Sequence, residues 1–309
     1  MSNIVEYIEQ KPEESQRLVG LKYEQLQQVL NNAKELHNKK LAEIQEGKTR
    51  VIKAGGGRKI KLSVSEQIML TLIYLRHLTT FQLLGIQFGV SETTANDTFN
   101  YWFPILGEML PSSILEQVKK NSGDNEIVTE LLAEYELIVD SWEQPRERPS
   151  VQEEQKKYYS GKKKNHTLKT TIIVLPSGID IVDIIPGSPG TKSDINLFRQ
   201  QQKNFNKEQK FKGDKAYIGE PSIRTPEKRK PRLELTAEQK SKNKKLSSAR
   251  IFVEHLIRLV QIFRVAKERF RLNIYKYKQI IFTICGIVRL RIGGLRLPNI
   301  NSEVLRKNN

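Results

Sequence analysis

The spacing of apolar residues changes near residue 130, and this change constrains the fold more than any other feature of the chain. Over residues 18–30 and 62–102 the apolar side chains recur every three or four positions, which is the period of a helix with one buried face. From residue 135 on, the runs YELIVDSW and NHTLKTTIIV are typical of strands. We therefore predict an all-helical region followed by an α/β region whose sheet is covered by helices.

The helical region divides at AGGGRK, residues 54–59, because three consecutive glycines destabilise a helix. We predict a helical N-terminal arm over residues 1–53, a positively charged linker, and a second helical segment over residues 59–110. The α/β region should occupy residues 134–292. With 309 residues, the chain has room for about two domains of ordinary size.

The second helical segment has the order helix, glycine turn and capped helix. Ser65 is placed to cap its first helix, residues 80–88 form a second, and Ser91 follows Gly89 as the N-cap of a third that reaches about Trp102. This order suits a helix-turn-helix whose last helix enters the major groove of DNA, and it also suits an ordinary three-helix bundle. In the first case the side chains that would reach base edges are Thr93, Thr94, Asn96 and Asn100.

The α/β region begins with strands that we expect to end at Asp140, before Pro176 and at Pro186. A helix capped by Ser193 or Asp194 follows, with the cap favoured over a ligand role for Asp194. The short strand FKGD then leads into a long basic loop.

The last part of the chain is predicted to be helical. Thr236 should cap a helix with an interruption near Ser247 and Ser248, after which residues 249–270 are helical again. An apolar stripe on this helix contains Val253, Leu256, Val260 and Phe263. The single cysteine, Cys285, lies in an apolar run and is expected to be a buried hydrophobic residue.

The chain is strongly basic, with 52 Lys and Arg against 35 Asp and Glu, a formal net charge of +17 and a pI near 9.7. Such a positive field indicates a nucleic-acid partner more than an anionic membrane surface. No window contains the about 18 continuous apolar residues of a membrane span, so we expect a cytoplasmic protein without a membrane partner. The candidate contacts to a DNA backbone are Lys162, Lys163, Lys164, Arg224, Lys228, Arg229, Lys230 and the tract 240–245.

Three acids stand out against this basic background. Asp140 ends the first predicted strand, Asp214 ends the last, and Glu254 lies on the helix that follows the basic loop. Carboxylate oxygens at one end of a sheet could hold divalent cations, and two such ions can promote in-line displacement at a phosphate. Spacing alone, however, favours a surface helix in which Arg250, Glu254 and Arg258 form weak salt links.

Longer motifs decide between these interpretations. YYSGKKKNHTLKTTIIV at 158–174, GDKAYIG at 213–219 and RIFVEHLIRLVQIFR at 250–264 together resemble the catalytic domain of bacterial insertion-sequence transposases of the DDE type, the IS-five family and its eukaryotic Harbinger relatives. Residues 59–102 are similar to the helix-turn-helix that precedes that domain. The resemblance covers about residues 55–290.

The resemblance implies an RNase H-like catalytic domain with a mixed sheet flanked by helices. It also implies two Mg²⁺ or Mn²⁺ ions per active site, held by Asp140, Asp214 and Glu254. Arg250 matches a DNA-contacting arginine of related enzymes, whereas Ser247 and Gln261 stand where those enzymes have Tyr and Lys.

The function implied is that of a transposase, which binds the terminal inverted repeats of its element and cleaves and rejoins DNA. The partners would be the element ends and the target DNA as double strands, and the protein would act as a homodimer or larger assembly. Two alternatives share most of these features. One is a catalytically inactive DNA-binding protein on the same scaffold, and the other is an endonuclease without strand transfer.

Overall fold

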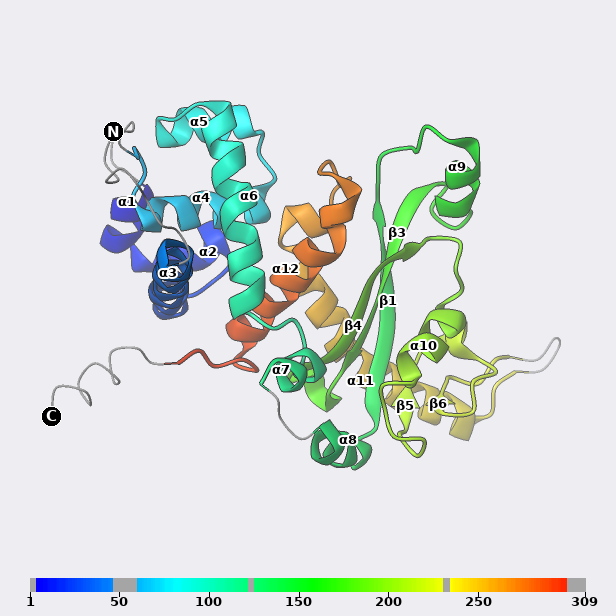
Figure 1. The fold of residues 1–309 in the computed structure, drawn as a ribbon. Coiled ribbons are helices and arrows are strands. Elements are labelled where there is room, and N and C mark those ends of the chain that lie inside the picture. Colours follow the sequence, from blue (N-terminus) through cyan, green and yellow to red (C-terminus); the bar gives the residue numbers. More distant parts are fainter. Residues whose placement is uncertain (1–3, 47–59, 122–124, 230–233, 299–309) are drawn as a thin grey trace, which may run out of the picture. The chain divides into compact units, whose positions relative to one another are not determined.

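The computed structural model describes residues 4–46, 60–121, 125–229 and 234–298 (Figure 1). These residues form two compact units. Unit 1 contains the residues up to Leu110 together with Phe263–Val265 and the segment from Leu295, and unit 2 contains Pro111–Ile262 and Ala266–Gly294. The expected linker at 54–59 and the candidate DNA contact Lys230 lie outside the described residues.

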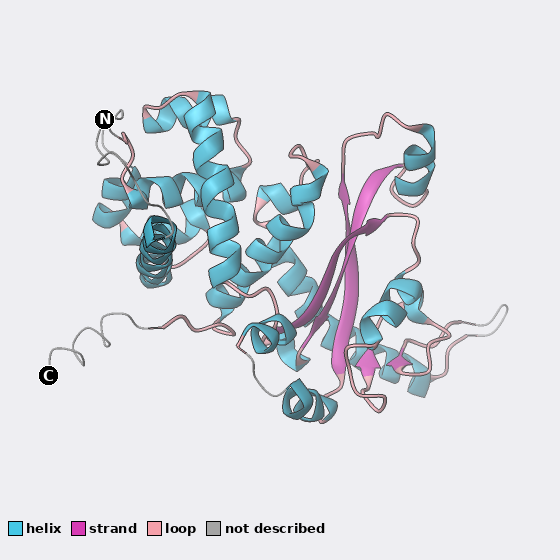
Figure 2. Ribbon diagram, viewed as in Figure 1, coloured by secondary structure: helices cyan, strands magenta, loops and turns pink. Residues whose placement is uncertain are grey.

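Unit 1 is helical in its described residues, as predicted (Figure 2). The first three α-helices pack against α4, and α3 also packs against α6, so the residues expected as an arm share a unit with the helix-turn-helix segment. His77 is half-buried, and its Nε2 lies 2.8 Å from the carbonyl oxygen of Leu18, so it is a structural histidine. The elements are α1 (Ile4–Gln10), η1 (Pro12–Glu14), α2 (Ser15–Val19), α3 (Tyr23–Glu46), α4 (Val64–His77), α5 (Phe81–Phe88) and α6 (Glu92–Met109).

Two helix ends in unit 1 differ from the prediction. Ser63, not Ser65, caps α4: its hydroxyl accepts the N–H of Glu66, whose carboxylate accepts the N–H of Ser63. This is the reciprocal capping box, which the spacing Ser-x-x-Glu encodes. Helix α6 continues past Trp102 to Met109, because Phe103 and other apolar side chains of its last turns are buried.

Unit 2 contains one mixed sheet. Strand β3 is antiparallel to β1, β2 and β4, while β5 runs parallel to β1 and β6 parallel to β5. The order is β2-β3-β1-β5-β6, with β4 also paired to β3. With helices packed on it, this is the expected RNase H-like architecture. The strands are β1 (Leu137–Pro145), β2 (Tyr159–Ser160), β3 (Asn165–Val174), β4 (Ile181–Pro189), β5 (Phe211–Lys212) and β6 (Ile223–Arg224).

The strands run further than expected. β1 continues through Asp140 to Pro145, because its residues up to Pro145 pair with β3. Asp140 therefore lies within the strand and not at its end. β4 likewise continues beyond Pro186 to Pro189. Asp214 follows β5 but does not end the last strand, since β6 comes after it.

The helices of unit 2 include several that the sequence did not suggest, namely α7, α8 and α9. Thr236 caps α11 as predicted, but the helix is continuous through Ser247 and Ser248, and the hydroxyl of Ser248 donates to the carbonyl of Lys244 one turn earlier. None of the described helices is long and apolar enough to cross a membrane. The helices are α7 (Ile114–Lys120), α8 (Asn125–Ala133), α9 (Gln152–Tyr158), α10 (Asp194–Gln202), α11 (Ala237–Gln261) and α12 (Tyr277–Ile292).

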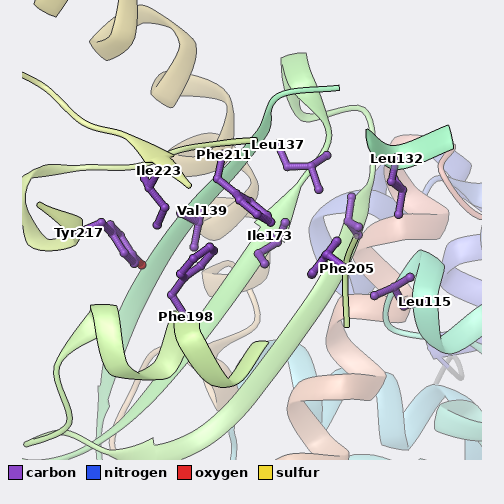
Figure 3. Packing of buried hydrophobic residues seen from close by; sticks show 11 residues of the cluster. Leu115, Leu132, Leu137, Val139, Ile173, Phe198, Phe205, Phe211, Tyr217 and Ile223 are labelled. Atoms are coloured by element: carbon purple, nitrogen blue, oxygen red, sulfur yellow. The ribbon is translucent and has the colours of Figure 1, made fainter. Parts of the chain in front are cut away.

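The two faces of the sheet have separate cores. On one face, Val139 of β1 packs with Phe198 of α10 and with Phe211, whose ring meets that of Phe198 edge to face at 4.8 Å (Figure 3). The other face is covered by α11 and α12. Val253, Leu256 and Val260 of the predicted apolar stripe are buried on α11, whereas Phe263 is buried beyond its end, because the helix stops at Gln261 and does not continue to residue 270 as predicted. Cys285 is buried and free.

A buried ion pair joins α12 to the start of β4. Arg289 is 1% exposed, and its guanidinium donates to both carboxylate oxygens of Asp180 at 2.7 Å. It also donates to the carbonyl of Pro111 and to the side chain of Gln117, both at 2.9 Å. Every branch of the guanidinium thus has an acceptor, which offsets the cost of removing two charges from water.

Replacing this arginine should destabilise unit 2 strongly. Arg289→Met would leave the carboxylate of Asp180 buried without a cation, and we expect the free energy of unfolding to fall by about 3–5 kcal/mol. Arg199→Met is the matched control, because Arg199 is 54% exposed in its pair with Glu220 and should contribute at most about 1 kcal/mol. Urea denaturation measures both, and equal losses for the two variants would contradict this account.

Candidate active site

The candidate active site lies where β1 extends beyond β5. The two strands pair only at Leu137 with Phe211 and at Ile138 with Lys212, so from Asp140 on, one edge of β1 has no strand partner among the described residues. Because β1 and β5 are parallel, the residues that follow their paired segments come to the same end of the sheet. Asp140 and Asp214 are brought together in this way.

Asp140 is largely buried at this edge. Its Oδ1 accepts the backbone N–H of Ser141 at 2.8 Å, and its Oδ2 lies 3.3 Å from Nη2 of Arg250. Burial raises the pKa of Asp140, the Ser141 N–H and the Arg250 guanidinium oppose this, and the negative charge of Asp214 adds to it. Two carboxylates are therefore close enough to influence one another electrostatically.

Helix α11 supplies the third acid. Glu254 lies one turn after Arg250, and Nη2 of Arg250 is 3.7 Å from Oε1 of Glu254. The same guanidinium nitrogen therefore contacts Asp140 on β1 and Glu254 on α11. Asp140, Asp214 and Glu254, which are far apart in the sequence, are brought to one region of unit 2.

The fit of this region to divalent cations follows from its donors. As they stand, no three His, Cys, Asp or Glu side chains within the described part of the chain are grouped tightly enough to hold a metal ion. The donor set itself is suitable, because carboxylate oxygens are the ligands that Mg²⁺ prefers. A positive group, the guanidinium of Arg250, already occupies the position between Asp140 and Glu254.

Asp214 also shapes the turn on which it lies. Its Oδ1 accepts the N–H of Ala216 at 2.7 Å, so it caps the short helix η3 (Lys215–Tyr217). Tyr217, at the end of that turn, is buried (Figure 3). Burial raises its pKa well above the usual range, and the charges of Asp194, Asp140 and Asp214 add to the effect.

Asp194 is a further acid close to Tyr217, and the sequence analysis favoured a capping role for it over a ligand role. Ser193, not Asp194, caps α10 by accepting the N–H of Asn196. The carboxylate of Asp194 instead accepts the hydroxyl of Ser141 at 2.6 Å and lies 3.2 Å from Nζ of Lys169. The adjacent pair Ser193 and Asp194 contains a signal for this, because only one of two neighbouring residues can be the N-cap of the helix.

The predicted basic contacts lie in different surroundings. Lys162, Lys163 and Lys164 are exposed on the tight turn between β2 and β3. Lys228 and Arg229 are also exposed. Arg224 is exposed too but lies 2.7 Å from Glu136 in an ion pair. The exposed lysines of the first half of α11 are Lys240, Lys242, Lys244 and Lys245.

The helix-turn-helix segment has the predicted turn. Thr80 caps α5, Gly89 has a left-handed φ of 68°, and Ser91 caps α6. Gly85 permits the close approach of the two helices, because a Cβ there would lie 2.7 Å from the carbonyl oxygen of Val90.

The four candidate base contacts on α6 differ in exposure and in their hydrogen bonds to other side chains. Thr93 and Thr94 are exposed, and the hydroxyl of Thr94 is hydrogen-bonded to that of Ser91 in the cap. Asn96 and Asn100 are half-buried, and the amide of Asn100 donates to the side-chain oxygen of Asn96. Thr93 is thus the exposed candidate outside the cap and outside the asparagine pair.

Comparisons with known proteins match both the helix-turn-helix segment and the α/β region. Residues 139–289 match the family described as DDE superfamily endonuclease, and residues 61–112 match the helix-turn-helix of DDE superfamily endonuclease. The chain is 31% identical over 221 residues to the probable transposase for insertion sequence element IS702 of Microchaete diplosiphon, which covers 70% of this chain and 76% of that protein.

Among solved structures, the chain is similar to the Mos1 transposase in its paired-end complex with the left transposon end. The identity is 14%, the alignment covers 82% of this chain and 83% of that one, and the TM-score is 0.24. The mariner Mos1 paired-end complex with Mg matches at 12% identity and a TM-score of 0.20, with the same coverage. TM-scores of this size do not establish the position of any individual residue. The sequence matches to both units and to the IS702 protein are decisive, and the chain belongs to the DDE superfamily of endonucleases, among the transposases of insertion sequence elements.

Proposed function

We propose that this chain is an active transposase of the IS-five kind, which binds the inverted repeats at the ends of its element and catalyses strand cleavage and strand transfer. The observation that carries the proposal is the single guanidinium of Arg250 in contact with both Asp140 and Glu254, with the charge of Asp214 acting on Asp140. A metal-dependent reaction would account for acids near this sheet edge, two of which contact one guanidinium.

Asp140, Asp214 and Glu254 would hold Mg²⁺ or Mn²⁺, as two ions per active site. When bound, the ions would stabilise negative charge on the phosphate oxygens and favour ionisation of the attacking oxygen. The carboxylates themselves would fix where the reacting phosphate lies relative to the attacking group. Such positioning, together with electrostatic stabilisation, accounts for most of the catalysis of phosphoryl transfer.

Basic side chains would hold the DNA around this point. Lys162, Lys163 and Lys164 on the β2–β3 turn, with Lys228 and Arg229, are exposed cations of the same unit as the acids. Arg250 would pair with a DNA phosphate after leaving the acids, whose charge the bound cations would then neutralise. Arg224 could do the same only after exchanging its partner Glu136.

The helix-turn-helix segment would recognise the element ends. In this proposal α6 lies in the major groove, where Thr93, Thr94, Asn96 and Asn100 reach base edges. Since an element has two ends, the working assembly would be a homodimer or larger, acting in the cytoplasm on chromosomal DNA. Water would attack first to free a 3′-hydroxyl, and that hydroxyl would then attack the target strand.

Asp214→Asn tests the catalytic role. Asparagine is as good a helix cap as aspartate, so the turn at η3 should persist while one negative ligand is lost. We expect Mg²⁺-dependent cleavage of a duplex carrying an element end to fall by more than about a hundredfold, since loss of even an outer-shell partner of a metal costs about 10- to 100-fold. Binding of that duplex should be retained.

Asp183→Asn is the matched control, because Asp183 is a half-buried strand carboxylate that pairs with Asn204 away from the acids. It should cleave like the unmodified protein. Normal cleavage by Asp214→Asn would show that Asp214 is no metal ligand, and joined product in the unmodified protein separates a transposase from a simple endonuclease. An unmodified protein that binds ends but never cleaves would support the inactive scaffold.

Thr93→Asp tests recognition by α6. A new negative charge on the helix that enters the groove would face DNA phosphates and leave a base edge unpaired, so affinity for the element end should fall by about tenfold or more. Asn38→Asp, at an exposed position of α3, is the control, because it makes the same charge change in the same unit. Fluorescence anisotropy with labelled duplex measures both, and equal affinities for the two variants would exclude α6 as the reading helix.

A further inference from the structure

A polar cavity of about 560 Å³ opens beside the acids of unit 2. Its floor is the unpaired edge of β1 at Ser141–Glu143, so it begins at the residue next to Asp140. The β2–β3 turn forms one wall, the loop before α10 forms another, and Gln261 near the end of α11 completes the lining. The volume falls within the range of about 300–1,000 Å³ that is typical of sites for small ligands.

The two acids in the wall of this cavity share one buried lysine. Lys169 is buried, and its Nζ lies 3.2 Å from Asp194 and 4.0 Å from Glu143. The hydroxyl of Thr167 donates to Glu143 at 2.7 Å, and that of Ser141 donates to Asp194 at 2.6 Å. Each carboxylate therefore already has a hydroxyl donor and the shared ammonium group of Lys169 inside the protein.

Three further lysines line the cavity, and their charges are not neutralised. Lys162, Lys163 and Lys192 are exposed, and none of them lies in an ion pair with any described residue. They come from two separate segments, the β2–β3 turn and the loop before α10. Because the acids are paired with Lys169, the cavity presents a net positive charge to an incoming ligand.

The walls that carry these lysines are held in place. A Cβ at Gly190 would collide with the hydroxyl of Thr167, so only glycine lets the loop before α10 lie this close to β3. The hydroxyl of Thr191 donates to the carbonyl of Lys157 at 2.7 Å, which ties the loop before α10 to the last turn of α9. The backbone N–H of Lys163 donates to the buried Ser160 at 3.3 Å. The site is therefore built before any ligand enters.

We propose that this cavity binds one backbone phosphate of the DNA strand next to the phosphate that reacts, through Lys162, Lys163 and Lys192. The proposal rests on the proposed function, since it takes the acids around Asp140 as the point of reaction. Lys169 acts as a positioning residue, because its charge offsets part of the repulsion that Glu143 and Asp194 would exert on a phosphate. Contact with one phosphate on the flank of the reacting one fixes the strand along its axis.

Single-phosphate neutralisation tests this proposal. The Asp214→Asn protein, which should bind without cleaving, is titrated with duplexes that carry one element end and one methylphosphonate at successive positions around the cleavage point. We expect one such uncharged linkage, adjacent to the reacting phosphate, to weaken binding about tenfold, as for the loss of one charge-assisted contact. In Asp214→Asn with Lys162→Gln, Lys163→Gln and Lys192→Gln, the same linkage should have no further effect.

A second triple variant controls for net charge. Lys203→Gln, Lys207→Gln and Lys210→Gln remove the same charge from exposed lysines of unit 2 outside the cavity, so sensitivity to that linkage should persist. Equal sensitivity in both triple variants would overturn the proposal while leaving the function intact. Cleavage by the Asp214→Asn protein, or failure of the unmodified chain to bind the element end, would instead contradict the proposed function.

Discussion

The burial of Asp140 is the constraint on which the rest of the site depends. A carboxylate largely removed from water is costly unless a positive group or hydrogen-bond donors compensate it. The N–H of Ser141 and the guanidinium of Arg250 do so here, yet burial still raises the pKa of Asp140. The carboxylate thus has a need for positive charge that a divalent cation would meet better than one arginine. In the proposed function, Glu254 and Asp214 share that cation.

Strand β1 serves two sites because neighbouring residues point to opposite faces. Asp140 faces α11 and its Arg250, whereas Ser141 and Glu143 face α10 and the buried Lys169. On the first face, Asp140 and Glu254 contact the guanidinium of Arg250. On the second face, Glu143 and Asp194 share the ammonium group of Lys169. In the proposed function, a DNA strand approaches the acids at the open edge of β1, beyond its short pairing with β5. Gln261 is uncharged, and the exposed positive charges of the cavity belong to lysines of other segments.

The sequence predicted the two-part architecture well, because the change of period from helix to strand reflects which faces are buried. The resemblance, and not the spacing, also implied that Asp140, Asp214 and Glu254 hold metal ions together, and this stays a prediction. The extension of β1 past Asp140 was missed, since pairing with β3 overrides the weak strand propensity of SWEQP. The partner of Arg224 is Glu136, distant in sequence, and no local pattern could reveal it. A capping role was favoured for Asp194 because an acid at the start of a helix suits a cap as well as a ligand.

The central claim is that Asp140, Asp214 and Glu254 share divalent cations, and anomalous diffraction from crystals of the full chain soaked in Mn²⁺ tests it most directly. The account predicts manganese peaks with carboxylate oxygens of these three residues as direct ligands, and the guanidinium of Arg250 displaced from between Asp140 and Glu254. Manganese bound only elsewhere, with Arg250 still in contact with both acids at saturating concentration, would contradict it.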